Sequence, residues 1–591
     1  MAETKVDVDY YHKVVDCQWA CPAHTPVPEY IRLIGEGRYS EAYMINRDSN
    51  VFPGILGRVC DRPCEPACRR GRLEDEEPVA ICRLKRVAAD YKGDVSALLP
   101  QAPSEKNGKK VALIGAGPAS LTVANDLAPL GYDVTIYEKN KKAGGAMRFA
   151  VPMFRLPPKV LDEEIDAIVN MGINMKYDTP VSSLKNLLTD YDSIFIGAGA
   201  PIGRDLEIPG REDSEGSVHV GLDWLANVAF EHTKSIQEKV IVIGGGNTAM
   251  DCCRTARRIG GKQVKVIAPE SFEQMLASPW EKDDSQEEKI EFINHLLPQE
   301  FVVDNGKFKG VRFQHLKQCY DENMKWDPVP SGEADVFIEC DDVILAIGQS
   351  TAFNYIESDV GIDFNDRKMP VVDSVTYQSS NPKVFFGGDA AFGPKNIIWA
   401  VAHGHEAAIS IHSYLQGLSV NDRPPRGMNL ISQKMGIHQW SYGNDYSDDK
   451  RFKVPHVEVG RRIDELKTEV ELGYDEKLAI EEASRCLNCD VQTVFDTPSC
   501  IECDACVDIC PVKCLTMTED LPIEELKAQL SAPVLNSEQN MLISGPLVQT
   551  KRIMVKDEDL CVHCGLCAER CPTGAWDMQK FILDLPKASD L

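Results

Sequence analysis

The chain has 591 residues, of which 43% are hydrophobic and 26% charged, and 91 acidic against 64 basic residues give it a formal charge of −27. This length exceeds what one hydrophobic core supports, and the acidity argues against nucleic acid or an anionic membrane surface as a partner. No apolar run approaches the length that spans a bilayer, so we expect no membrane insertion. The polar N-terminus MAETKVDVDYYHK lacks the regions of an export signal, and we therefore expect a soluble, cytoplasmic protein.

Twenty-one cysteines provide the most informative pattern in the chain. In a reducing compartment, closely spaced cysteines are better interpreted as metal ligands than as disulfides. The first group comprises Cys17 and Cys21 in CQWACP, Cys60, Cys64 and Cys68 in CDRPCEPACRRG, and Cys82 in AICRLKR. The last four make a complete quartet, for which zinc is an alternative metal, whereas the first two are two ligands short.

The stretch KKVALIGAGPASL, from Lys109, predicts a strand, a glycine turn and the start of a helix. Gly115 and Gly117 let the backbone approach a pyrophosphate, and Ser120 replaces the third glycine of the motif with another small residue. The next predicted strand, YDVTIYEKN, contains Glu138 near its end, where a carboxylate can accept hydrogen bonds from a ribose. The stretch therefore predicts a dinucleotide-binding fold.

A second copy of this motif is EKVIVIGGGNTAMD, in which Gly244, Gly246 and Ala249 take the three fingerprint positions after an apolar strand. One glycine motif is weak evidence, but two copies with strand, turn and helix in order are specific. Two dinucleotides suggest a flavin and a nicotinamide. That pairing allows a hydride to be divided into single electrons.

Two copies of Cys-x2-Cys-x2-Cys-x3-Cys-Pro stand near the C-terminus, CIECDACVDICP and CVHCGLCAERCP. In this bacterial-ferredoxin pattern, three cysteines bind one [4Fe–4S] cluster and the fourth crosses to the other. The predicted sets are Cys500, Cys503, Cys506 and Cys571 for one cluster, and Cys561, Cys564, Cys567 and Cys510 for the second. A pair of zinc knuckles is the alternative, and Cys514 is expected to be a bystander.

Residues 12–420 resemble the small subunit of glutamate synthase and the N-terminal part of dihydropyrimidine dehydrogenase, through GAGPASL, GGAMRFAVPMFRLP, IGGGNTAMD, DVILAIGQ and FFGGDAA in that order. The resemblance implies that the first fingerprint binds FAD and that the second, inserted within the FAD domain, binds NAD(P)H. The cofactor-binding residues predicted in this way are Gly115, Gly117, Pro118, Ser120, Glu138, Gly145, Arg148, Gly388 and Asp389 for FAD, and Gly244, Gly246, Asn247, Thr248 and Glu270 for the nicotinamide nucleotide.

One departure from this family concerns the choice of nucleotide. NADPH-using members typically carry Tyr-Arg-Arg at the end of the strand after the second fingerprint, whereas this chain reads KVIAPE, with Pro269 and Glu270 at the arginine positions. A carboxylate there would repel a 2′-phosphate and could bind a free 2′-hydroxyl, so we expect NADH rather than NADPH. Arg254, Arg257 and Arg258 follow the fingerprint closely and offer a substitute for the missing arginines.

The resemblance also implies that the first hundred residues form a small helical domain with two [4Fe–4S] clusters. In the family, a Cys-x2-Cys pair within a stretch resembling EA-x-RCL-x-C stands just upstream of the Cys-x3-Cys-Pro portion. Here the corresponding stretch is EASRCLNCD, far downstream. We hypothesise that Cys486 and Cys489 complete the quartet of Cys17 and Cys21, which gives four clusters in all. The alternative is a separate small metal site or free thiols.

The predicted fold class is α/β, with two Rossmann-like dinucleotide-binding domains, an N-terminal α-helical iron–sulfur domain and a C-terminal α+β bacterial-ferredoxin-like domain. The predicted boundaries are 1–104 for the helical iron–sulfur domain, 105–232 and 341–425 for the FAD domain, 233–340 for the NAD(P)H domain, 426–495 for a returning segment and 496–591 for the ferredoxin-like domain.

This order of domains predicts an FAD-dependent NAD(P)H oxidoreductase that acts as the electron-transfer subunit of a hetero-oligomeric complex. It would exchange electrons between NAD(H) and a partner oxidoreductase subunit or ferredoxin, through FAD and four clusters. Hydride transfer requires no acid–base pair, and the sequence indicates no catalytic residue. The alternatives are a glutamate synthase small subunit, a flavin-based electron-bifurcating NAD(P)H:ferredoxin oxidoreductase subunit, and a non-enzymatic scaffold.

Overall fold

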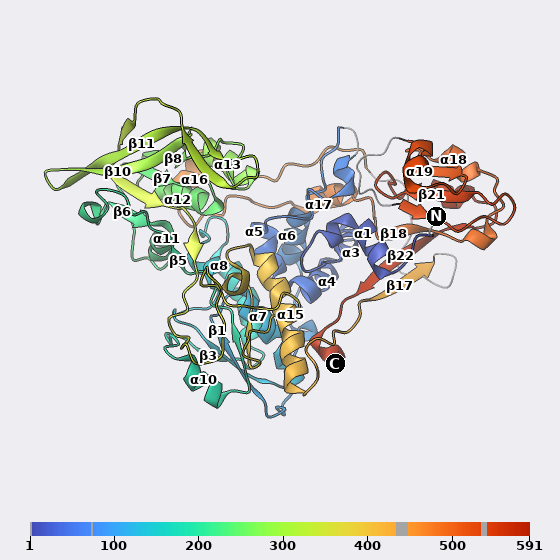
Figure 1. Ribbon diagram of the computed structural model, residues 1–591, viewed down its shortest axis with the longest axis horizontal. Coiled ribbons are helices and arrows are strands. Elements are labelled where there is room, and N and C mark those ends of the chain that lie inside the picture. The colour runs from blue at the N-terminus through green and yellow to red at the C-terminus, as the bar shows by residue number, and fades with distance from the viewer. Residues whose placement is uncertain (1–2, 73–74, 433–446, 533–540) are drawn as a thin grey trace.

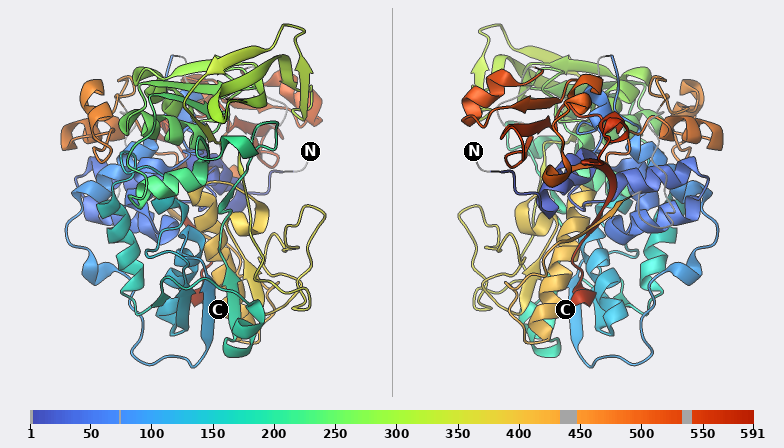
Figure 2. Two further views of the ribbon diagram at one scale, coloured as in Figure 1. Left: turned by 90° about the vertical axis from the view of Figure 1, so that its left-hand side faces the viewer. Right: turned by 90° about the vertical axis from the view of Figure 1, so that its right-hand side faces the viewer.

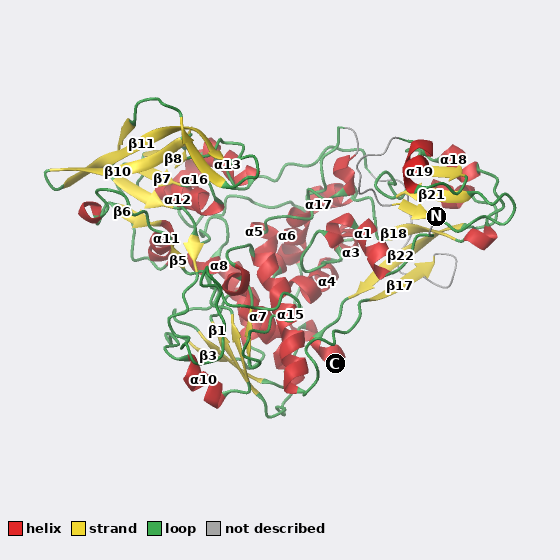
Figure 3. Ribbon diagram, viewed as in Figure 1, coloured by secondary structure: helices red, strands yellow, loops and turns green. Residues whose placement is uncertain are grey.

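The computed structural model describes residues 3–72, 75–432, 447–532 and 541–591. N-terminal helices occupy the middle of the molecule, with two nucleotide-binding sheets on one side and the C-terminal strands on the other (Figures 1 and 3). The predicted fold class, α/β with cysteine-rich units at both ends, is confirmed. Within the described ranges, no helix combines the length and apolar character needed to cross a membrane.

The N-terminal unit consists of short helices that bury one face each. They are α1 (Val8–Val14), α2 (Asp16–Trp19), α3 (Val27–Gly35), α4 (Tyr39–Asn50), α5 (Pro53–Val59) and α6 (Ile81–Tyr91). Proline in the first turn of α3 and of α5 sets the backbone for helix entry without losing a hydrogen bond. Tyr30, Phe52 and Leu84 are fully buried between the helices. This packing holds together the helices and loops that carry the cysteines.

The first nucleotide-binding sheet is parallel, with strand order β16-β4-β1-β2-β3. Its strands are β1 (Lys110–Ile114), β2 (Asp133–Tyr137), β3 (Asn174–Lys176), β4 (Ser193–Ile196) and β16 (Val384–Phe386). β1, β4 and β16 are almost completely buried, as expected for strands covered on both faces. Helices α7 (Pro118–Leu127) and α15 (Ile397–Leu415) pack against each other beside this sheet.

The second sheet is also parallel and lies above the first in both views of Figure 2. Its order is β6 (Val218–Val220), β14 (Asp342–Leu345), β7 (Lys239–Ile243), β8 (Gln263–Ala268) and β9 (Glu291–Asn294). Helices α11 (Gly221–Ala229), α12 (Asn247–Arg258) and α13 (Pro279–Glu287) belong to this unit. β6 and β14, which precede and follow the predicted 233–340 range, also belong to this sheet.

An antiparallel layer covers one face of the second sheet. It consists of β10 (Leu296–Asp304), β11 (Lys307–Tyr320), β12 (Trp326–Pro330) and β13 (Val336–Glu339). Phe301 and Phe313 from this layer pack against Ile241 and Ile267 of the sheet. The layer therefore buries the apolar face that the helices leave uncovered.

The C-terminal unit has two small antiparallel sheets. One contains β17 (Gly427–Ser432), β22 (Trp576–Asp584) and β18 (Val491–Phe495), and the other contains β19 (Leu515–Thr518), β21 (Ile553–Asp557) and β20 (Met541–Ile543). Three short helices accompany them, α18 (Ala505–Ile509), α19 (Ile523–Gln529) and α20 (Leu566–Arg570). β17 and β18 come from the predicted returning segment, so that segment contributes strands to the ferredoxin-side sheet.

The returning segment also contains α16 (Val459–Asp464) and α17 (Glu476–Ala483), and α17 packs against α3 and α6. At the end of α17, the fully buried Glu482 accepts a hydrogen bond from the backbone N–H of Ala80 at 2.8 Å and another from Arg485 at 2.8 Å. Arg485 is also fully buried and donates to the carbonyl of Glu77 at 2.7 Å. This network fastens the segment that carries Cys486 and Cys489 to the N-terminal unit.

We expect Glu482→Ala to destabilise the protein strongly, because it removes the 2.8 Å carboxylate partner of the buried Arg485 and leaves only Glu76, at 3.4 Å. Removing one partner of a buried ion pair costs about 3–5 kcal/mol. The midpoint of urea unfolding, followed by tryptophan fluorescence, measures the change. Glu481→Ala is the matched control, since Glu481 makes only a 3.8 Å pair with the exposed Lys477. Equal midpoints for the two variants would contradict this role of Glu482.

Candidate functional site: a nucleotide cavity beside four cysteine sets

A cavity of about 470 Å³ lies where the two sheets and the N-terminal unit meet. Of the predicted residues, those that line it are Gly115, Gly117, Pro118, Glu138, Gly145, Gly388 and Asp389 from the first motif group, and Asn247 and Thr248 from the second fingerprint. Val59, Cys60 and Asp61 of the helical unit form part of its wall. The cavity thus joins both predicted nucleotide sites to a cysteine loop.

The backbone of the first fingerprint forms a close-fitting cradle. Gly145 has φ +53°, and a Cβ at this position would lie 2.9 Å from the Cα of Gly117, so only glycine fits. Glu138 lies below this turn, accepting hydrogen bonds from the N–H groups of Ala116 and Asn140 at 2.8 Å each. These contacts fix its carboxylate at the cavity wall. The open backbone and the adjoining acid fit an adenine dinucleotide such as FAD.

The N-terminus of α15 borders the same cavity through Asn396, Ile397 and Ala400. Asn396 caps this helix by accepting from the N–H of Trp399 at 3.3 Å. The positive end of the helix dipole therefore points at the cavity, where it would stabilise negative charge on a bound ring system. Burial raises the pKa of the nearby Asp389 to about 6.

Two other predicted residues, Ser120 and Arg148, do not line the cavity and lie behind its wall. Ser120 is fully buried, and the backbone of Gly197 approaches it so closely that a Cβ there would lie 2.3 Å from the Ser120 hydroxyl. Arg148 donates to the carbonyl of Ala143 at 2.5 Å and to Asp162 at 2.5 Å. Ser120 therefore packs closely against the backbone of Gly197, and Arg148 supports the turn that precedes Gly145.

Glu270 follows β8 and lies directly on the second fingerprint loop, which contains Gly244 and Gly246. It is 6% exposed, and a Cβ at Gly245 would lie 2.4 Å from its Oε1. Burial raises the pKa of Glu270 above its usual value. The backbone carbonyl of Glu270 accepts from Asn294 at 2.7 Å, which fixes the end of the strand. Its carboxylate therefore stands where the adenosine ribose of a nucleotide on this loop would bind.

The three arginines near the second fingerprint are held by other groups. Arg254 pairs with Glu281, Asp284 and Glu288 at 2.8, 2.9 and 3.0 Å, and Arg258 pairs with Glu288 at 2.6 Å. Both guanidinium groups also lie over the ring of Phe154, at 5.0 and 3.8 Å. Arg257 donates to the carbonyls of Gly261 and Lys262 at 2.9 and 3.0 Å. These arginines therefore hold the domain together instead of facing the nucleotide.

The structure brings all the N-terminal cysteines and the downstream pair together, but in a grouping that differs from the predicted one. Cys17, Cys68, Cys486 and Cys489 line one small pocket, which we name the shared set. Cys21, Cys60, Cys64 and Cys82 form the second group, named the flavin-side set. In the flavin-side set, Cys82 lies within hydrogen-bond reach of Cys60 and Cys64.

The sequence analysis grouped Cys21 with Cys17, Cys486 and Cys489, and Cys68 with Cys60, Cys64 and Cys82, whereas in the structure Cys68 lines the pocket of Cys17, Cys486 and Cys489. Cys17 lies within α2 and Cys21 lies in the bend that follows that helix, and the two thiols reach different sets. Burial lowers the pKa of Lys85, but the negative charges of the four cysteines of the flavin-side set raise it by more. The ammonium of Lys85 therefore faces the whole set. The hypothesis that Cys486 and Cys489 return to meet Cys17 agrees with the lining of the pocket.

The C-terminal cysteines lie in the two predicted groups. Cys500, Cys503, Cys506 and Cys571 line one small pocket, named the outer ferredoxin set. Cys510, Cys561, Cys564 and Cys567 form the inner ferredoxin set, in which the charges of Cys561 and Cys510 raise the pKa of Cys564 in addition to the larger effect of burial. Cys514 is buried beside this set, with its Sγ 3.4 Å from that of Cys510, and is closer to the ligands than a bystander would be.

Several functional candidates escaped the sequence analysis. Arg155 lines the cavity and pairs with Asp251 and Glu281 at 2.7 Å each, which ties the first motif group to α12 and α13. Trp280 also lines the cavity, under the guanidinium of Arg62 at 3.9 Å. Arg155 belongs to the quoted stretch GGAMRFAVPMFRLP, which was a usable signal. No local pattern pointed to Trp280, because its role depends on contacts between distant segments.

This fold and this cavity define a flavin- and nicotinamide-dependent oxidoreductase with iron–sulfur units at both ends. The family model of pyridine nucleotide-disulphide oxidoreductases matches residues 109–404, and the chain belongs to this family. Residues 11–96 match dihydropyrimidine dehydrogenase domain II with its 4Fe–4S cluster, and residues 499–575 match a 4Fe–4S dicluster domain.

The similar proteins include subunits of several different complexes. The NADP(+)-dependent formate dehydrogenase subunit beta of Moorella thermoacetica is 34% identical, over 80% of this chain and 70% of its own length. The NAD-dependent dihydropyrimidine dehydrogenase subunit PreT homolog of Salmonella typhi is 33% identical, over 68% and 91%. The glutamate synthase [NADPH] small chain of Escherichia coli K12 is 33% identical, over 68% and 88%. The resemblance predicted from the motifs is confirmed.

The new grouping of cysteines makes a prediction about iron content. If each set holds one [4Fe–4S] cluster, Cys68→Ser with Cys486→Ser should remove only about four irons per chain, because both residues serve the shared set. Cys21→Ser with Cys486→Ser should remove about eight. Colorimetric iron analysis of the purified variants measures the loss, and Cys319→Ser is the control. The reverse order of the two losses would restore the grouping predicted from sequence.

Proposed function

We propose that the protein is the electron-transfer subunit of an oxidoreductase complex, exchanging electrons between NAD(H) and a partner catalytic subunit or ferredoxin through FAD and four [4Fe–4S] clusters. The observation that carries this proposal is the position of Cys60, which belongs to the flavin-side set and also lines the nucleotide cavity. Electrons that leave a flavin in this cavity would thus meet the flavin-side set directly.

The chain's own residues orient the reactants. Bound FAD would take two electrons and one proton from NADH as a hydride and would return the electrons singly. Asn247 and Thr248 face the cavity from the second fingerprint, and Asn247 is itself fixed by accepting from the N–H of Ser278 at 2.8 Å. Arg155 holds α12 and α13 against the first sheet. On the cluster side, Asp61 accepts from Asn396 at 3.1 Å, which holds the Cys60 loop at the start of α15.

The order of the cysteine sets supports a linear path. The flavin-side set borders the cavity, and Tyr30 lies among Cys64, Cys82, Cys17 and Cys21, between that set and the shared set. The shared set in turn borders the C-terminal unit, because Arg69 of its pocket donates to the carbonyl of Cys561 at 2.8 Å. We infer that the outer ferredoxin set, which contains the exposed Cys503, exchanges electrons with the partner.

NADH is the nucleotide that the second site favours. The carboxylate of Glu270 lies on the fingerprint loop, and Arg254, Arg257 and Arg258 are engaged elsewhere. A 2′-phosphate would therefore meet a negative charge without a positive counterpart from these three arginines, whereas a 2′-hydroxyl can donate to Glu270. Of the three relatives named above, the names of two specify NADP(+) or NADPH and the name of one specifies NAD.

The simplest test of the proposed function is anaerobic addition of NADH to the purified holoprotein. The flavin absorbance should bleach, and EPR signals of reduced [4Fe–4S] clusters should appear. Cys60→Ser should leave the bleaching intact and reduce the cluster signals, because the flavin-side set would lose a ligand. A flavin that stays oxidised in excess NADH would instead favour a structural scaffold.

The choice of nucleotide is tested by kcat/KM with NADH and with NADPH, using ferricyanide as the acceptor. We expect NADH to be preferred by at least tenfold, and Glu270→Gln to reduce that preference by removing the repelling charge. Arg257→Ala is the control, because its guanidinium only caps the carbonyls of Gly261 and Lys262. A preference for NADPH in the unmodified protein would refute the assignment.

A further inference from the structure

One of the contacts between the N-terminal and C-terminal units is the buried guanidinium of Arg69, which is 3% exposed. Its Nε and Nη2 donate to the carboxylate of Asp16 at 2.9 and 2.7 Å, and Nη2 also donates to the carbonyl of Val14 at 3.2 Å. On the other side, Nη1 donates to the carbonyls of Cys561, at 2.8 Å, and Glu558. The guanidinium therefore bonds to both units at once.

These partners place Arg69 between two cysteine sets. Arg69 follows Cys68, and Asp16 precedes Cys17, so both groups are attached to the shared set. Cys561, whose carbonyl accepts from Arg69, belongs to the inner ferredoxin set. Burial lowers the pKa of Arg69, and the charges of Asp16, Cys489 and Cys561 raise it by more. The positive charge is thus held next to thiols from each set.

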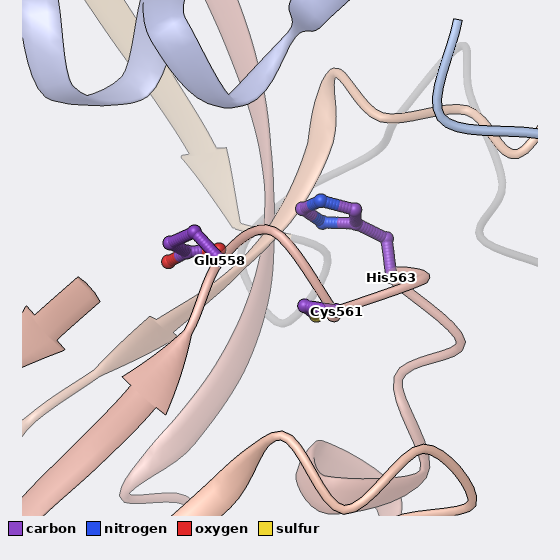
Figure 4. A group of neighbouring side chains, drawn as sticks. All are labelled: Glu558, Cys561 and His563. Carbon is purple, nitrogen blue, oxygen red and sulfur yellow. The ribbon is translucent and has the colours of Figure 1, made fainter. Parts of the chain in front are cut away.

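The C-terminal side of this junction is a largely buried loop between β21 and α20. Figure 4 shows Glu558, Cys561 and His563 on this loop, and all three are buried. Glu558 pairs with the buried Lys556 at 2.9 Å and accepts a hydrogen bond from the hydroxyl of Tyr10 in α1. In the described part of the chain, neither ring nitrogen of His563 has a hydrogen-bond partner. A charge in such surroundings is screened weakly.

We propose that Arg69 is a positioning residue for electron transfer between the shared set and the inner ferredoxin set. It fixes the two sets relative to each other, and its permanent charge raises the reduction potential of the clusters bound there, since reduction adds negative charge. If each set holds a [4Fe–4S] cluster, one electron would pass from the reduced cluster at the shared set to the oxidised cluster at the inner ferredoxin set. No covalent bond forms or breaks, and no proton is transferred. The inference rests on the proposed function.

The test compares Arg69→Met and Arg69→Lys with a matched control, Arg32→Met. Arg32 donates to both oxygens of Asp490, at 2.7 and 2.8 Å, and Asp490 follows Cys489 of the shared set. The control therefore removes a positive charge beside the same set without touching the Cys561 loop. For each holoprotein we would measure iron per chain, the midpoint potentials of the clusters by EPR-monitored titration, and the rate of reduction of the ferredoxin clusters after mixing with NADH.

We expect Arg69→Met to retain its iron and its flavin reduction, to slow reduction of the ferredoxin clusters at least tenfold, and to lower their potential. A tenfold change in the one-electron equilibrium corresponds to about 59 mV. Arg69→Lys should retain most of the midpoint potential but not the rate of cluster reduction, because an ammonium cannot donate to all the carbonyls that the guanidinium reaches. Arg32→Met should leave the inner ferredoxin set unchanged. Unaltered rate and potential in Arg69→Met would overturn the proposal.

Loss of iron is examined separately with Arg69→Met combined with Asp16→Asn, because Arg69→Met leaves the partly buried carboxylate of Asp16 paired only with Arg72. If this double variant also loses iron, Arg69 acts as a structural anchor and the proposal is overturned. Failure of the proposed function is distinguishable from both outcomes. In that case NADH would not bleach the flavin of the unmodified protein, whereas the potentials can still be compared with dithionite as the reductant.

Discussion

The architecture depends on the closure of the shared set, to which three distant parts of the chain contribute. Cys17 and Cys68 come from the N-terminal unit, and Cys486 and Cys489 come from a segment that returns after both nucleotide-binding sheets. The buried pair of Glu482 and Arg485 holds that segment in place. Because β18 begins at Val491, directly after the returning pair, closing this set also brings the C-terminal strands against the N-terminal helices. One constraint therefore positions the units at both ends.

Buried cations accompany the cysteine sets of this strongly acidic chain. Lys85 faces the flavin-side set, Arg69 the shared set and Lys556 the inner ferredoxin set. Four thiolates with their iron and sulfide carry net negative charge, which is costly to bury without a counter-charge. If each set holds a [4Fe–4S] cluster, these cations would lower that cost and would also influence how readily the cluster accepts an electron. Although the chain carries a formal charge of −27, a positively charged residue lies beside each of these three sets.

Sequence patterns predicted most of the fold and many of the residues that surround the cavity. Gly115, Gly117 and Glu138 follow from local rules of strand, turn and carboxylate spacing, and the ferredoxin sets follow from the repeat. The grouping of Cys21 and Cys68 could not be predicted in the same way, because it depends on how the segments that follow α2 and Cys64 pack in three dimensions, which no local spacing specifies. Arg69 and Trp280 act through partners hundreds of residues away, and no local spacing marks such contacts.

Anomalous diffraction at the iron absorption edge, from crystals of the holoprotein, tests the central claim most directly. The account predicts four separate iron peaks, one of which lies among the sulfur atoms of Cys17, Cys68, Cys486 and Cys489. A second peak should lie among Cys21, Cys60, Cys64 and Cys82, beside the nucleotide cavity. Iron bound by Cys60, Cys64, Cys68 and Cys82 together, or no iron beside Cys486 and Cys489, would contradict the account.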